Sequence, residues 1–296
     1  MKKIALALAV ALACGGVNAA DTLAKIKSAG KVMIGTRDSS APLAYTIGDG
    51  KYVGYHVDVC LKIADAIKAA LKAPALPVEY TVVTSANRLP LVQNGTVDME
   101  CGSTTNSTAR AQQVAFAPTT FVTNVRTAVK ASSGITSIAQ LGGKTIATTT
   151  GTTSVQLLRK HEKAGGVDFK ELFGKDHADS FLLLESGRAD AFVMDDNILA
   201  GLIVNSKNPA EFKIVGESLS EEPIAIMIPK DDPAYKKLVD DTVIGLMKSG
   251  ELEKMYTKWF MSPVPPRNAI VGMPMSAALK NAIANPNDKP VEAYRK

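Results

Sequence analysis

The order of apolar and polar residues predicts alternating strands and helices in the first part of the chain. Short runs of apolar and β-branched residues at 31–35, 78–83 and 97–102 are typical of strands. Apolar side chains recur at helical spacing over 57–71, and a shorter helix is expected at 87–93. This β-α-β-α-β order with short connections favours a mostly parallel sheet with helices on both faces.

The same order begins again after about residue 140. The expected elements are a strand at 144–148, a helix that opens at 151–154 and runs to about 161, a helix at 181–186 and a strand at 190–194. A strand near 223–229 and helices at 235–248 and 251–260 follow. The repetition predicts an α/β protein with two lobes of similar construction.

The N-terminus has the pattern of a secretory signal. Lys2 and Lys3 precede the apolar run 4–14, and small residues follow at 17–20. The run is shorter than the ~20 apolar residues that span a bilayer. We therefore expect a signal peptide over residues 1–20 and a periplasmic mature protein, with a buried N-terminal helix as the alternative.

Charge and cysteine content narrow the possible partners. The net charge of +5 falls to +3 without the signal, which holds two lysines and no acids, and no basic block with interleaved aromatics occurs. A nucleic-acid partner is therefore not expected. Cys60 and Cys101 are left after cleavage, and either one disulfide or two buried thiols fits their apolar surroundings.

The common motifs of enzymes and metal sites are incomplete. Gly143-Lys144-Thr145 resembles the end of a phosphate-binding loop, but Ile138 stands where that loop requires glycine. His161-Glu162 has Gly165 where a zinc-protease helix needs its second histidine. With three histidines in the chain, we expect neither a metal site nor a cofactor.

Two loops carry polar residues where an α/β sheet binds ligands. One covers 101–106 and leads to Arg110, and the other covers 148–154. Both are expected beyond the carboxyl ends of strands and at helix starts, where hydroxyl and N–H groups hold anions. An arginine adds a bidentate contact to a carboxylate. The alternative is that the Ser and Thr residues are ordinary N-caps.

The chain resembles the periplasmic solute-binding proteins of polar amino-acid ABC transporters (family 3), and among them the glutamate/aspartate-binding proteins. The resemblance covers nearly the whole mature chain. It rests on the stretches 31–40, 53–58, 84–90, 100–106, 151–154, 175–180, 184–190 and 195–196, and on Lys258-Trp259-Phe260.

The resemblance implies a type II periplasmic binding protein fold. Two lobes, joined by two hinge strands, would close on a ligand in the cleft between them. Lobe 1 would comprise residues 21–123 and 222–296, and lobe 2 residues 124–221. The implied protein is a monomeric receptor that is not an enzyme, which binds L-glutamate or L-aspartate and delivers it to the permease subunits of an ABC transporter.

The resemblance also implies a set of ligand-binding residues. Asp195 would pair with the α-ammonium of the ligand. The α-carboxylate would be held by Ser103, Thr105, Arg110 and Thr153, and the side-chain carboxylate by Arg37, Ser85, Arg88 and His177. Three arginines against one aspartate suit a ligand with two anions and one cation, because an unpaired buried carboxylate is costly.

Structural roles stay open for several of these residues. Arg88 could pair with Asp98 or Glu100, Arg37 could be a solvated loop charge, and His177 could be a helix-start residue. Asp196 leaves an ambiguity of one position for Asp195, and no role is assigned to Glu221 and Glu222. The alternative functions are an enzyme on the same fold, similar to cyclohexadienyl dehydratase, and a receptor for a neutral or basic amino acid.

Overall fold

The computed structural model describes residues 21–165 and 167–294. The signal peptide expected over residues 1–20 lies outside this range. Among the described residues, no helix combines the length and the apolar character needed to cross a bilayer.

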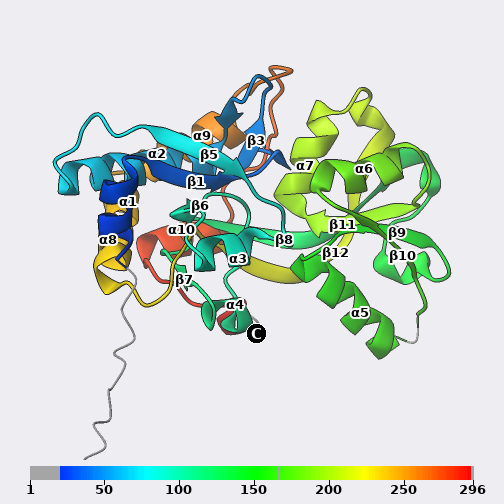
Figure 1. The fold of residues 1–296 in the computed structure, drawn as a ribbon. Coiled ribbons are helices and arrows are strands. Elements are labelled where there is room, and N and C mark those ends of the chain that lie inside the picture. Colours follow the sequence, from blue (N-terminus) through cyan, green and yellow to red (C-terminus); the bar gives the residue numbers. More distant parts are fainter. Residues whose placement is uncertain (1–20, 166, 295–296) are drawn as a thin grey trace, which may run out of the picture.

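The structure consists of two α/β lobes, each built on its own five-stranded sheet (Figure 1). In lobe 1, β1 pairs in parallel with β5 and β6, whereas β13 pairs antiparallel with β6 and β7. The strand order is β5 (Val78–Val82), β1 (Val32–Thr36), β6 (Met99–Glu100), β13 (Met227–Ile228) and β7 (Ala115–Phe116). A small three-stranded sheet beside it contains β2 (Ser39–Ser40), β3 (Ala44–Thr46) and β4 (Tyr52–Val53).

The sheet of lobe 2 has parallel and antiparallel neighbours. β9 pairs in parallel with β10 and β11, and the long β8 pairs antiparallel with β11 and β12. The strand order is β10 (Lys170–Gly174), β9 (Thr145–Thr149), β11 (Ala191–Asp195), β8 (Phe121–Lys130) and β12 (Phe212–Ile224). Apolar clusters cover both faces of this sheet, as the near-continuous apolar strands require.

Helices cover the sheets in both lobes. Lobe 1 contains α1 (Thr22–Ala29), α2 (Tyr55–Ala70), α3 (Arg88–Gln93), α4 (Thr108–Ala111), α8 (Pro233–Lys248), α9 (Glu251–Phe260) and α10 (Ala277–Ala284). Lobe 2 contains α5 (Thr153–Gly165), α6 (His177–Glu185) and α7 (Asp196–Asn205). Single 3₁₀ turns are η1 (Ala131–Ser133), η2 (Ile138–Leu141), η3 (Pro209–Glu211) and η4 (Val291–Ala293).

The helix expected at 181–186 begins four residues earlier, at His177. Asp176 caps it, because its carboxylate accepts from the N–H of the third helical residue while Asp179 accepts from the Asp176 N–H. This reciprocal cap precedes the apolar positions on which the sequence interpretation relied. The correction brings His177 to the first turn of α6.

Two long strands connect the lobes. β8 and β12 pair antiparallel from Phe121 and Ile224 to Lys130 and Phe212, with an irregularity between Val215 and Ser220. In Figure 1 they run from the centre of the molecule into lobe 2. The expected lobe boundaries, after residues 123 and 221, fall inside these strands and stay a prediction.

The core of lobe 1 anchors the first of these strands. Phe121 at the start of β8 stacks with Tyr256 and Phe260 at centroid distances of 6.1 and 5.1 Å, and the Tyr55 hydroxyl donates to the Thr120 carbonyl (2.9 Å). These aromatic side chains are almost fully buried. The entry of the chain into the connecting strand is therefore part of a packed core.

The open question about the cysteines has a definite answer in the structure. Cys60 on α2 and Cys101 directly after β6 form a disulfide with a Cα–Cα distance of 6.3 Å. The bond ties the long helix of lobe 1 to the beginning of the polar loop 101–106.

Candidate ligand-binding site between the lobes

The carboxyl ends of parallel strands from both sheets meet at one place between the lobes. Open α/β sheets bind ligands at this end of their strands, where loops and helix starts converge. In lobe 1 the residues come from the segments after β1, β5 and β6: Arg37, Ser85, Arg88, Ser103, Thr105 and Arg110. In lobe 2 they come from the ends of β9, β10 and β11: Thr153, His177 and Asp195.

Seven of these nine residues line one small cavity. The seven are Ser85, Arg88, Ser103, Thr105, Thr153, His177 and Asp195. Thr152 and Met194 complete its lining and were not expected from the sequence. Arg37 and Arg110 lie against members of the lining. The structure thus brings Ser85 and Asp195, which are 110 positions apart in the sequence, to the same cavity.

Arg88 is a buried cation at the first position of α3. Its exposed fraction is 2%, and within the described part of the chain its Nε and Nη1 have no hydrogen-bond partner. Asp98, a suggested partner, instead accepts from Lys25 Nζ and the Met33 N–H, both at 2.7 Å. Burial, and next the charge of Arg110, lower the pKa of Arg88 to about 9. Arg88 is therefore a charged group with hydrogen-bond donors to spare.

Arg37 is fully buried, so it is not a solvated loop charge. Its Nη2 lies 2.7 Å from Asp176 Oδ1 and 3.2 Å from His177 Nε2, and both partners belong to lobe 2. Burial is the largest single influence and raises the pKa of Asp176, but the charge of Arg37, together with His177 and the hydrogen bonds from Ser39 and Arg37, lowers that pKa to about 2. Ser39 also donates to Asp176 (2.7 Å). Arg37 thus joins the two lobes through an ion pair beside the cavity.

His177 combines a helix-start position with a place in the cavity wall. Its Nδ1 is 3.0 Å from Thr149 Oγ1, and its exposed fraction is 1%. Burial, followed by the nearby charge of Arg37, holds the pKa of His177 well below 6.5. The imidazole is therefore neutral at neutral pH, with one ring nitrogen as a donor and the other as an acceptor.

The ambiguity between Asp195 and Asp196 is resolved by their contacts. Asp195, the last residue of β11, lines the cavity and is 4% exposed. Asp196 accepts from Thr123 Oγ1 (2.8 Å) and the Asn124 N–H (3.3 Å), so it is bound to β8. Burial, then the charges of Glu222 and Asp196, raise the pKa of Asp195 well above its usual value. Asp195 is the acid that faces the cavity.

Arg110 lies on α4 at the border of a larger groove between α3, α4 and α5. Its Nη1 donates to the Thr105 carbonyl (2.9 Å) and its Nη2 to the Gly151 carbonyl (3.4 Å). One guanidinium thus contacts both polar loops, one from each lobe. Burial lowers the pKa of Arg110, and the charge of Glu222 acts in the opposite direction.

The C-terminal segment braces the loop that carries Arg110. Asn106 Nδ2 donates to the Asp288 carbonyl and the Val291 N–H donates to the Asn106 carbonyl, both at 2.8 Å. The Thr108 N–H donates to Glu292 Oε2 (3.0 Å) at the first residue of α4. The sequence indicates only a short helix and a polar tail here, because such contacts carry no local pattern.

Glu222 is the functional candidate that the sequence left without a role. It lies in β12, is fully buried, and accepts hydrogen bonds from Thr105 Oγ1 (2.7 Å) and Thr153 Oγ1 (2.8 Å). The sequence does not indicate which of the neighbouring acids Glu221 and Glu222 points inward, because only the strand register decides which one is buried.

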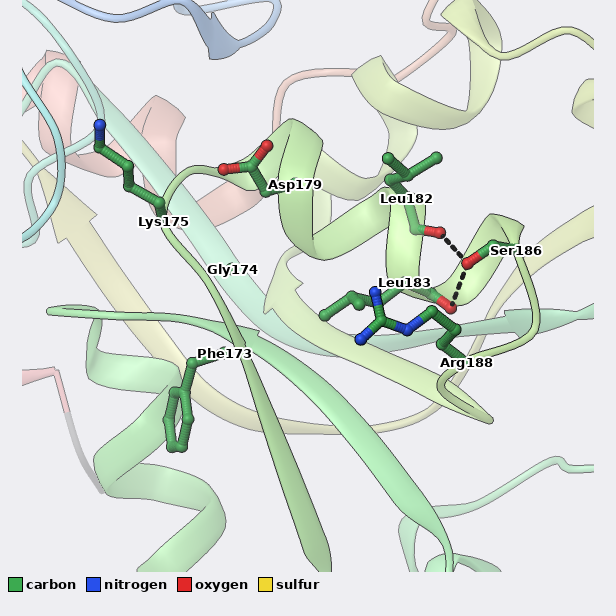
Figure 2. Close-up of a pocket in the computed structure, with 8 residues that line it drawn as sticks. All are labelled: Phe173, Gly174, Lys175, Asp179, Leu182, Leu183, Ser186 and Arg188. Atoms are coloured by element: carbon green, nitrogen blue, oxygen red, sulfur yellow. Dashed lines mark hydrogen bonds between the residues drawn. The ribbon is translucent and has the colours of Figure 1, made fainter.

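A second depression lies on lobe 2, away from the nine residues (Figure 2). Figure 2 shows Phe173 on β10 and Leu182 on α6 at its sides, with exposed fractions of 46% and 57%. Lys175 and Arg188 are its cations. None of the residues expected to bind ligand lines it.

Comparison with known proteins defines the class. Residues 32–262 match the family described as bacterial extracellular solute-binding proteins, family 3. The chain belongs to this family, and its two-lobed α/β fold is that of the type II periplasmic amino-acid-binding proteins. The resemblance inferred from the sequence and the predicted fold class are both confirmed.

The chain is 43% identical over 289 residues to the glutamate/aspartate import solute-binding protein of Escherichia coli K12, covering 95% of this chain and 96% of the relative. It is also 43% identical to the L-glutamate/L-aspartate-binding protein of Pseudomonas aeruginosa, with 92% and 90% covered. Among solved structures, the receptor for L-cysteine of Neisseria gonorrhoeae has a TM-score of 0.70 and 27% identity, with 81% and 93% covered.

Proposed function

We propose that this protein is a periplasmic receptor that binds L-glutamate or L-aspartate between its lobes and delivers it to an ABC permease. The observation that carries the proposal is the buried Arg88, whose Nε and Nη1 have no partner within the described residues, in a cavity that also contains Asp195. A carboxylate ligand would satisfy the guanidinium and an ammonium would pair with the aspartate.

The cavity supports separate positions for the two ends of such a ligand. At one end, Arg88, Ser85 and neutral His177 would hold the side-chain carboxylate, with Arg37 behind them. At the other end, Arg110 would hold the α-carboxylate and Asp195 the α-ammonium. Further contacts to the α-carboxylate would come from Ser103, Thr105 and Thr153.

The relatives support this ligand class. Both 43%-identical relatives are named for glutamate and aspartate, and they match nearly the whole chain. An ancestral amino-acid-binding protein described as a precursor of cyclohexadienyl dehydratase has a TM-score of 0.69 and 25% identity, with 81% and 99% covered. We propose binding without catalysis, because the relatives that match nearly the whole chain are named as solute-binding proteins.

The remaining parts of the proposal concern location and assembly. We propose that residues 1–20 direct export and are removed, and that the mature protein is a monomer. The lobes would close over the ligand, and the closed form would dock on the permease. Export is tested by the mass of protein recovered from a periplasmic extract, which should lack the first 19 or 20 residues.

A thermal-shift assay of the mature protein tests the ligand class. Glutamate, aspartate, glutamine, lysine and arogenate are compared at equal concentrations. A ligand present at 100 times its Kd stabilises by about 2.7 kcal/mol. We expect a clear shift with glutamate or aspartate. A shift with lysine or glutamine and none with the acidic amino acids would refute the proposed specificity.

Two arginine variants test the assignment of the two ends. Arg110→Ala should abolish binding of every amino acid, because each carries an α-carboxylate. Arg88→Ala should reduce the affinity for acidic ligands far more than the affinity for glutamine, as measured by titration calorimetry. Arg267→Ala, at an exposed position of lobe 1, is the matched control. Equal losses for glutamate and glutamine in Arg88→Ala would remove Arg88 from the specificity role.

A further inference from the structure

Glu222 is an acid inside the region between the lobes that the proposed function does not yet use. Its residue in β12 pairs with Thr123 of β8, where the two connecting strands leave lobe 1. Its exposed fraction is 0%, whereas the preceding Glu221 is exposed. A buried carboxylate is costly unless it is paired or hydrogen-bonded, so its partners indicate its role.

Glu222 receives hydrogen bonds from both lobes through a single oxygen. Thr105 Oγ1, from the loop after β6 in lobe 1, and Thr153 Oγ1, from the start of α5 in lobe 2, donate to Oε2 at 2.7 and 2.8 Å. Within the described residues, Oε1 is buried and has no hydrogen-bond partner. The carboxylate therefore stands behind two residues of the cavity wall.

These bonds decide what the two threonines offer to a ligand. A hydroxyl has one proton and two lone pairs. Since the protons of Thr105 and Thr153 point to Glu222, the hydroxyl oxygens present acceptors to the cavity that both residues line. Their contribution to an α-carboxylate would come from backbone N–H groups, such as those in the first turn of α5, which have no intrahelical acceptor.

The charges at this end of the cavity agree with an acceptor site. The carboxyl groups of Asp195 and Glu222 interact with each other, and the Arg110 guanidinium interacts with both. Asp196 and Arg88 act on Asp195 as well, so three acids face two arginines, which leaves room for one further cation. An ammonium group brings one positive charge and three donors, which matches the hydroxyl acceptors and the carboxylate of Asp195.

We propose that Glu222 is a positioning residue of the ammonium subsite. Acting through Thr105 and Thr153, it makes this end of the cavity select ligands that carry an α-ammonium over dicarboxylates that lack one. The inference rests on the proposed function and deepens it, because it explains how the protein would reject simple diacids that share both carboxylates with glutamate.

The test compares glutamate with glutarate, which has the same two carboxylates and no amine. Calorimetric titrations at pH 7 use the wild type, Glu222→Gln and the control Glu221→Gln. We expect Glu222→Gln to lose roughly tenfold or more in affinity for glutamate. Its affinity for glutarate should stay the same or increase, so the preference for glutamate should fall by at least that factor. Glu221→Gln should behave as the wild type.

Each other result decides against the inference or against the function. If the wild type binds glutamate and Glu222→Gln keeps the wild-type preference over glutarate, the inference is overturned. An equal loss of affinity for both ligands in Glu222→Gln also overturns the inference, because a purely structural role would give that result. An equal gain for both ligands overturns it too, because it would mean that Glu222 repels a ligand carboxylate. If the wild type fails to bind glutamate, the proposed function is wrong. Should Glu222→Gln not fold, as monitored by ligand-free melting, Glu222→Asp decides by the same ratio.

Discussion

Replacing Arg88 by methionine should stabilise the ligand-free protein while it abolishes binding of acidic ligands. Arg88 is almost fully buried, and two of its three nitrogen groups lack partners within the described residues. Methionine is unbranched and apolar, so it fills much of the same space without a charge. The prediction follows because, without ligand, the site contains a buried positive charge that is not fully paired and that destabilises the folded protein.

The magnitude follows from the lowered pKa. The change from 12.5 to about 9 corresponds to a penalty of ~5 kcal/mol on the charged guanidinium, caused first by burial and then by Arg110. This penalty already includes the opposing attraction of Glu100 and Asp195, which raises the pKa of Arg88. We expect a net increase of about 1–3 kcal/mol in the free energy of unfolding, because the shorter methionine leaves part of the arginine's space unfilled and so offsets part of the penalty that is removed.

Urea unfolding without ligand, followed by calorimetry with glutamate, measures both effects. Arg267→Met serves as the exposed control and should change neither quantity. Binding of glutamate should fall below detection in Arg88→Met. A ligand-free stability that drops by more than 1 kcal/mol, together with retained glutamate affinity, would contradict the reasoning. In that case the guanidinium would be a structural group.

Three further predictions concern stability, closure and pH. Replacing Cys60 and Cys101 by alanine opens a loop with a sequence separation of 41 and should cost about 3–4 kcal/mol in urea unfolding, whereas unchanged stability would contradict the disulfide. In Gly201→Ala, the added methyl group would overlap the carbonyl of Ala41 in the other lobe. The affinity for glutamate should therefore fall at least tenfold in calorimetry, while the ligand-free melting temperature stays the same or rises. An unchanged affinity would show that the lobes do not approach this closely. Burial lowers the pKa of His56 to about 4, so on acidification the unfolded chain takes up a proton near pH 6.5, before the folded protein does. The free energy of unfolding should therefore decline by up to about 3 kcal/mol as the pH falls from 6.5 to 4. His56→Gln should make this decline smaller.

The periodic elements could be predicted from the sequence because their signals are local. The helix expected at 57–71 is α2, Tyr55–Ala70, and the strand expected at 31–35 is β1, Val32–Thr36. The start of α6 was predicted too late, because a reciprocal cap between Asp176 and Asp179 sets it. The repeated order of strands and helices predicted two lobes, and the resemblance to a family supplied the type II fold, which the comparisons confirm.

The sequence and the family resemblance predicted which residues gather at the candidate site, but not which charged side chains pair with one another. The structure places seven of the nine expected residues around one cavity, although their roles in binding stay a proposal. That Arg37 pairs with Asp176, and that Asp98 pairs with Lys25 rather than Arg88, depends on contacts between distant segments. Charge type is visible in a sequence, whereas the partner of a charge is not.

By itself, the sequence determined the secondary-structure pattern, the export signal as an expectation, and the types of group available for ligand binding. These follow from apolar periodicity and from side-chain chemistry, which are properties of neighbouring residues. Only the tertiary structure decided which of Glu221 and Glu222 is buried, and that Cys60 meets Cys101. The physical reason is that strand register and helix packing bring distant residues together, and a shift by one residue in a strand exchanges its buried and exposed faces.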